Sequence, residues 1–121
     1  MLRTFARAAA LSVAIAALPS AVAAHTAGEL YQDCTDSHGS SSRISCLAYM
    51  HGLMDGLAAA NALSAGGAVF RYCPPRGEIS VDELRLIFLN RVEARQDILK
   101  LDAGVFLAGA LMESFACPAE Q

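Results

Sequence analysis

CLAYMHGLMDG, residues 46–56, is the stretch around which we expect the rest of this chain to fold. Its apolar residues recur at helical spacing and continue into the next turn: Leu47, Met50, Met54 and Leu57. The small residues Gly52, Gly56 and Ala60 are four apart and form a second face of the same helix. Glycine inside a helix costs about 1 kcal/mol relative to alanine. The pattern therefore predicts a central helix with a neighbour packed closely against its glycines.

The first 24 residues have the pattern of a secretory signal peptide. Arg3 and Arg7 precede an apolar run at residues 8–18, and Ala21-Val22-Ala23 offers a cleavage site, with Ala24 as the alternative. The run is shorter than the roughly 18 to 20 residues that a membrane-spanning helix needs. We therefore expect a cleaved signal peptide at residues 1–24 and one exported domain at residues 25–121, with no membrane span.

The charge of the exported part argues against a nucleic-acid partner. The chain has 9 lysines and arginines and 12 acidic residues, and two of the arginines lie in the predicted signal peptide. The remaining 7 basic and 12 acidic residues give a net charge of −5. Proteins that bind nucleic acids usually present a basic surface.

The four cysteines all follow the predicted signal peptide, and an exported chain meets an oxidising compartment, so we expect two disulfides. Three pairings are possible, and the residues exclude none of them. We favour Cys46 with Cys73, which would hold the loop that returns after the central helix, and Cys34 with Cys117, which would join the first helix to the end of the last. A bridge that closes a long loop stabilises a small domain by about 3 to 4 kcal/mol in the chain-entropy model.

Local signals predict four helices and no strand, an all-α domain. Thr26 with Glu29 and Ser80 with Glu83 have the spacing of capping boxes. We expect a first helix up to Cys34, an exposed loop at residues 35–42, a central helix at 46–63 capped by Ser45, and a third helix ending near residues 95–97. Asp102 is the expected N-cap of the last helix. Its expected inward residues are Val105 or Phe106, Ala110, Leu111 or Met112, and Phe115.

No catalytic, cofactor or metal site is predicted. His51 and Asp55 are four apart on a helix and could share a metal, but such sites usually need three or four ligands, and we interpret them as a surface pair. The serines at positions 40–42 lack a nucleophile motif, and Gly66-Gly67 lacks a phosphate-binding pattern. We expect a protein that is not an enzyme and carries no cofactor.

The ordered set of motifs resembles the Rap1a/Tai family of type VI secretion immunity proteins. The resemblance covers residues 29–117 and depends on three segments: Cys46-x-x-Tyr49-x-x-Gly52-x-x-Asp55-Gly56, Cys73-x-Pro75, and Ala103-x-x-x-Leu107-x-x-Ala110-Leu111-x-x-x-Phe115-x-Cys117. It implies a periplasmic, all-helical binding protein that blocks the active site of a secreted peptidoglycan amidase effector, often as a homodimer. The cysteine placement is also similar to that of HdeA-like acid chaperones, which adds to the preference for Cys46 with Cys73.

Two other functions stay open at this stage, an HdeA-like acid chaperone and a structural envelope protein. For a binding protein, exposed loops held by disulfides are the expected contact sites, because an ordered loop loses less entropy on binding. Three loops qualify, and their candidate residues are Asp36, Ser37 and His38, then Arg76 and Glu78, then Asp97 and Lys100.

Overall fold

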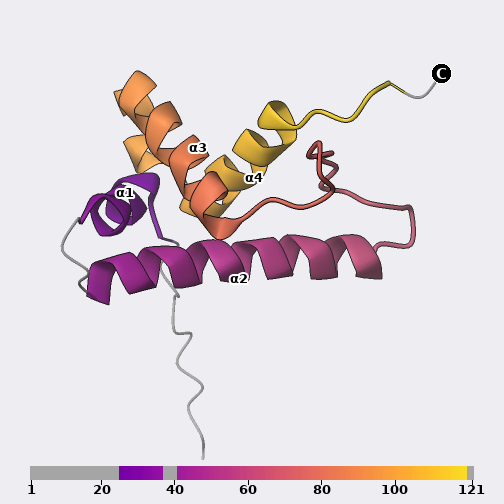
Figure 1. Ribbon diagram of the computed structural model, residues 1–121, viewed down its shortest axis with the longest axis horizontal. Helices are drawn as coiled ribbons and strands as arrows, with labels where there is room; N and C mark the ends of the chain where they lie inside the picture. Colours follow the sequence, from indigo (N-terminus) through magenta and orange to yellow (C-terminus); the bar gives the residue numbers. More distant parts are fainter. Residues whose placement is uncertain (1–24, 37–40, 120–121) are drawn as a thin grey trace, which may run out of the picture.

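The computed structural model describes residues 25–36 and 41–119, which form four α-helices and one 3-10 helix (Figure 1). The elements in chain order are α1 (Ala27–Thr35), α2 (Ser41–Leu63), α3 (Val81–Ala94), η1 (Gln96–Lys100) and α4 (Ala103–Ser114). Within this part of the chain there is no strand, only an isolated bridge between Thr26 and Asp102. The all-α prediction is confirmed. The predicted signal peptide, Ser37 and His38 lie outside the described residues.

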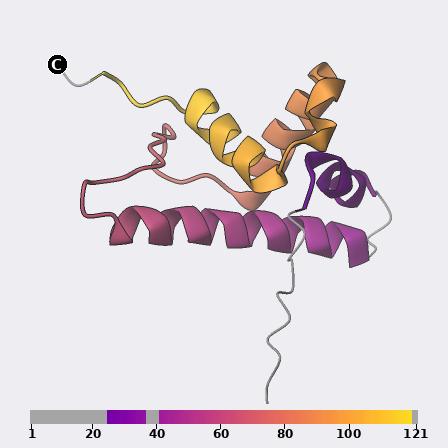
Figure 2. The ribbon, with the colours of Figure 1, turned by 180° about the vertical axis from the view of Figure 1, so that it is seen from behind.

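All the other helices lie on one side of α2 (Figures 1 and 2). α1 crosses its first turns, and α3 and α4 stand over its middle. The buried side chains of the four helices form one core, whose largest members are Phe88, Leu30, Met50, Leu84, Leu107 and Leu111. Among the described residues, no helix combines the length and the apolarity needed to cross a membrane.

Local capping signals were read correctly at three helix starts. Thr26 and Glu29 form a reciprocal capping box, in which the Glu29 amide donates to Thr26 Oγ1 and the Thr26 amide donates to Glu29 Oε2. Ser80 accepts a hydrogen bond from the Glu83 amide, and Asp102 accepts one from the Val105 amide. These caps satisfy backbone donors that have no partner inside the helix.

The predicted start of the central helix was wrong. Ser45 is not an N-cap, because α2 already begins at Ser41 and Ser45 lies in its second turn. No proline or glycine separates residues 41–45 from the apolar pattern, so the helix extends back beyond its first buried residue. As a result Cys46 lies inside the helix and on its buried face, together with Met50 and Leu57.

The disulfide pairing was also wrong. Cys34 is joined to Cys46 and Cys73 to Cys117, with Cα–Cα distances of 5.1 and 4.9 Å. Cys46 lies on the buried face of α2 against the end of α1, and both cysteines are fully buried. The return segment, residues 64–80, connects α2 to α3 and passes beside the end of α4. There the Cys73 amide donates to the Phe115 carbonyl at 2.7 Å, which places Cys73 next to Cys117. The HdeA-like pattern therefore does not apply to this chain.

The inward face of α4 differs in part from the prediction. Ala110 and Leu111 are buried as predicted, but Ala103, Leu107 and Ala108 are buried as well, and the predicted inward face did not include them. Val105 is 73% exposed, and Met112 also faces outward. Phe106 and Phe115 are half-buried and pack against the core. The apolar residues surround α4, so periodicity alone did not select its buried side.

The glycines of α2 are not packed against a neighbour, contrary to the prediction. Gly52 and Gly56 are exposed, and a Cβ atom built on either glycine meets no other atom within 4 Å. The predicted central position of α2 is also wrong: α2 lies along one side of the molecule, and only one of its faces contacts the rest of the described chain.

Candidate functional site

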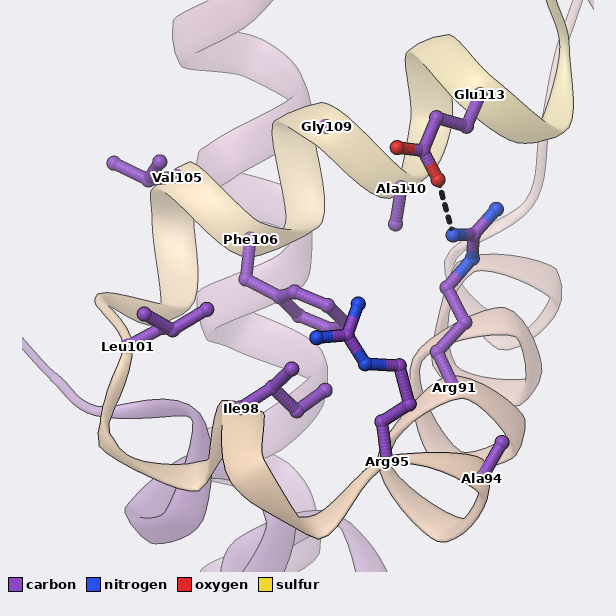
Figure 3. Close-up of a pocket in the computed structure, with 10 residues that line it drawn as sticks. All are labelled: Arg91, Ala94, Arg95, Ile98, Leu101, Val105, Phe106, Gly109, Ala110 and Glu113. Carbon is purple, nitrogen blue, oxygen red and sulfur yellow. Dashed lines mark hydrogen bonds and ion pairs between the residues drawn. The ribbon is translucent and has the colours of Figure 1, made fainter.

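The candidate site is a groove formed where α3, η1 and α4 meet (Figure 3). α3 ends at Ala94, and the Arg95 amide closes its last turn by donating to the Arg91 and Val92 carbonyls. The five residues of η1 then reverse the chain direction before Asp102 starts α4. This connection separates the ends of α3 and α4 enough to leave a cavity of about 400 Å³ between them.

The floor of the groove is apolar. Ile98 is buried, and the ring of Phe106 packs edge-on against Phe88 with 6.0 Å between ring centroids. Leu101 and Val105 also line the groove and are 50% and 73% exposed. When a partner covers apolar side chains that are this exposed, their apolar surface leaves water. This burial stabilises the complex by roughly 25 cal/mol for each Å² of apolar surface.

Two arginines from the end of α3 border the floor (Figure 3). Arg91 reaches across to α4, where it pairs with Glu113 at 2.5 Å and donates to Ser114 Oγ at 3.1 Å. Arg95 makes a two-point pair with Asp97, with N–O distances of 3.2 and 2.6 Å. This hydrogen bonding raises the pKa of Arg95 and lowers the pKa of Asp97. The Arg95–Asp97 pair therefore keeps both of its charges over a wider pH range than the separate side chains would.

The structure does not bring the predicted contact residues together. Asp97 lies at the groove through its pair with Arg95, and Lys100 is exposed at the end of the same 3-10 helix. Arg76 and Glu78 line a separate hollow beside Pro75 and Phe115. Asp36 is the C-cap of α1 and is not among the residues that line the groove.

The groove residues themselves were not predicted as a site. The sequence predicts Val105 or Phe106 as a core residue and assigns no role to Leu101. One signal was present in the sequence. Arg91 and Arg95 are four apart at the end of a helix and are followed by the apolar residues Ile98 and Leu101. That pattern places basic side chains beside apolar ones, but it does not show that α4 leaves a space there.

The contacts of the motif residues of α2 are those of structural residues. Tyr49 is half-buried beside His25, with 5.6 Å between ring centroids, and burial followed by the charge of Asp102 raises its pKa. His51 Nδ1 lies 3.3 Å from Asp55 Oδ2, and both side chains are mostly exposed, as expected for a surface pair. Within the described residues, no group of three or more histidine, cysteine or acidic side chains is placed to hold a metal ion.

These features define a small helical domain with two disulfides and an apolar groove that has a charged rim. The family model of Rap1a immunity proteins matches residues 26–117, and the chain belongs to this family. The predicted resemblance is thereby confirmed, and it supports an immunity-like binding role. Rap1a immunity proteins are generally binders without catalytic activity. No match was found among curated proteins or solved structures.

Proposed function

We propose that this protein is a periplasmic immunity protein of a type VI secretion system, which neutralises a cell-wall amidase effector by covering its active site. The single observation that carries the proposal is the family match across residues 26–117. The signal-peptide pattern at residues 1–24 and the two disulfides support an exported protein.

The groove between α3, η1 and α4 is the proposed contact surface. An interface core is typically apolar and its rim polar, and arginine is enriched where binding energy concentrates. Leu101, Val105 and Phe106 would supply the apolar centre, and Arg95 with Asp97 the rim. Lys100 extends the same rim. Arg76 and Glu78, which line a separate hollow, form a second contact region in this proposal.

Rigidity favours this role. The Cys34–Cys46 bridge joins α1 to α2, and the Cys73–Cys117 bridge joins the return segment to the end of α4. Arg91 and Glu113 connect α3 to α4 across the groove. A surface that is ordered before binding loses less conformational entropy when a partner docks.

The test is inhibition of a secreted peptidoglycan amidase encoded beside this gene. The exported, disulfide-bonded protein is mixed with the purified amidase, and release of peptides from peptidoglycan is measured. We expect stoichiometric loss of amidase activity and a dissociation constant in the micromolar range or tighter. A muramidase that cleaves the glycan strand of the same substrate serves as the control. Full amidase activity at saturating concentrations of the protein would contradict the proposal.

A further inference from the structure

The Cys73–Cys117 disulfide lies at the surface of the molecule. Cys73 is exposed and Cys117 is half-buried, whereas Cys34 and Cys46 have no exposed surface and join α1 to α2 inside the core. A reducing thiolate must reach a sulfur atom before it can open a disulfide. A dithiol protein can therefore attack the Cys73–Cys117 bridge in the folded chain, while the surrounding core shields the other bridge.

The exposed bridge fastens the return segment to the end of α4 (Figure 1). Every residue of the return segment is described, and none belongs to a helix or a strand, so no backbone ladder of its own holds it in place. The Cys73 amide also donates to the carbonyl of Phe115, which packs half-buried against the core just beyond the last helical residue, Ser114. The bridge is thus the covalent link between the middle of the return segment and the last turn of α4.

The last turn of α4 is also part of the groove. Glu113 lines the groove from α4 and pairs with Arg91 of α3 (Figure 3). The Arg91 guanidinium also donates to Ser114 Oγ at 3.1 Å. These two partners of Arg91 lie four and three residues before Cys117 in the chain. A helix end that loses its anchor frays first, because its last carbonyls have no partners inside the helix. Opening the bridge therefore acts on the contacts that join α3 to α4 across the groove.

We propose that the Cys73–Cys117 bridge is a redox-sensitive clasp on the groove. A thiolate of a dithiol protein attacks the Cys73 sulfur, forms a mixed disulfide and displaces Cys117 as a thiolate, which takes up a proton. The second thiol of the reductant loses its proton, attacks the mixed disulfide and releases Cys73, which is protonated in turn. The clasp gains two electrons and two protons, and the reductant leaves as a disulfide.

The open clasp changes one end of the molecule. The end of α4 separates from the return segment, Arg91 loses its hold on Glu113 and Ser114, and the groove loosens. The buried Cys34–Cys46 bridge keeps α1 joined to α2 throughout. This behaviour belongs to the fold and does not depend on which partner the groove binds.

The first test compares hydrogen exchange in the oxidised protein and in the Cys73→Ser/Cys117→Ser chain, whose hydroxyls are close in size to the open thiols. We expect exchange to rise at least about tenfold in peptides covering residues 109–115, and less than about twofold in α1 and the first half of α2. Wild-type protein treated with just enough dithiothreitol to open this bridge should show the same change, and reoxidation should reverse it. Loss of most of the helical circular dichroism in the variant would overturn the proposal, because the bridge would then hold the whole fold.

The second test measures the groove itself, by modifying its arginines with phenylglyoxal and locating the products by mass spectrometry. Arg91 crosses to α4, and its side chain is 33% exposed. Arg95 pairs with Asp97 in the adjoining 3-10 helix and is the internal control. We expect the open clasp to speed modification of Arg91 at least about threefold and to leave Arg95 unchanged. Equal rates at Arg91 in the two states would overturn the proposal, as would a parallel rise at both arginines, which would show general loosening and not release of α4.

Discussion

Gly28 and Gly109 are both helical glycines, but they have opposite surroundings. A Cβ atom at Gly28 would lie 3.0 Å from the Leu99 carbonyl oxygen, whereas one at Gly109 would meet nothing within 4 Å. We expect Gly28→Ala to lower the free energy of unfolding by about 1 to 2 kcal/mol, because a backbone atom must move. Gly109→Ala should raise it by about 0.5 to 1 kcal/mol through helix propensity. Urea denaturation of both variants measures the difference, and equal effects would contradict this account of Gly28.

Glu29 links stability to pH. Hydrogen bonds from the backbone amide of Thr26, and then from its hydroxyl, lower the pKa of this carboxylate. The folded state therefore favours the charged form, so the stabilisation is fully present above the unfolded pKa and is lost as the pH falls below about 4.5. Glu29→Gln keeps a capping box but removes the titration.

We expect thermal denaturation of Glu29→Gln to change less between pH 5 and about pH 3 than that of the wild type, because one linked proton is missing. Glu93→Gln, on the exposed part of α3, is the matched control and should follow the wild type more closely. The same acid dependence in all three proteins would show that the Thr26–Glu29 box does not contribute.

Residue-scale features could be predicted where the contact is local. The Thr26 and Asp102 caps join residues three apart, so the spacing in the sequence was sufficient. No local pattern in the sequence assigns a role to Arg85. Its guanidinium in fact donates to the Cys34 carbonyl at 3.2 and 2.9 Å and satisfies the end of α1. These two residues are 51 positions apart, and no local pattern connects them.

At the scale of elements, Asn61 fastens the return segment to the end of α2. Its side chain accepts from the Phe70 amide and donates to the Phe70 carbonyl, both at 2.9 Å. We expect Asn61→Ala to leave both backbone groups without this partner and to lower the free energy of unfolding by about 1 to 3 kcal/mol. Asn90→Ala, at an exposed position of α3, should have a much smaller effect. Hydrogen exchange at the Phe70 amide provides a local measurement, and unchanged protection would contradict this role.

The two disulfides differ in exposure. Cys34 and Cys46 are fully buried, whereas Cys73 is exposed and Cys117 is half-buried. Because thiol–disulfide exchange requires access to a sulfur atom, we expect a dithiol reductant to open Cys73–Cys117 first. Alkylation followed by peptide mass spectrometry should find labelled Cys73 and Cys117 while α1 and α2 are still joined. Simultaneous reduction of both bridges under native conditions would contradict this order.

Element types could be predicted from the sequence, but their pairing could not. Four helices follow from periodicity and caps, and all four are present in the structure. The disulfide pairing depends on which element packs against the buried face of α2 at Cys46, and that element is the end of α1. Cys73 reaches Cys117 through a backbone hydrogen bond to Phe115, and such a contact between distant segments has no sequence signature.

At the scale of the whole molecule, the class of protein could be predicted from the sequence. The residues of its candidate contact surface could be predicted only in part. The motif order in α2 and α4 led to the correct family. Exposed loops were a reasonable expectation for contact residues, and one of them contains Asp97 beside the groove. The groove itself results from the angle between α3 and α4 and from the rotation of α4 that leaves Val105 outward, both of which are set by core packing.

The most direct measurement of the central claim is the affinity of the secreted amidase for Leu101→Glu and for Leu86→Glu. The two leucines are similarly exposed, at 50% and 56%, but only Leu101 lines the groove. Burying an unpaired charge at an interface centre is costly, so we expect Leu101→Glu to weaken binding by at least about 100-fold, or roughly 3 kcal/mol, in calorimetric titration. Leu86→Glu should bind as the wild type does. Equal affinities for the two variants would contradict the assignment of the groove as the surface that binds the partner.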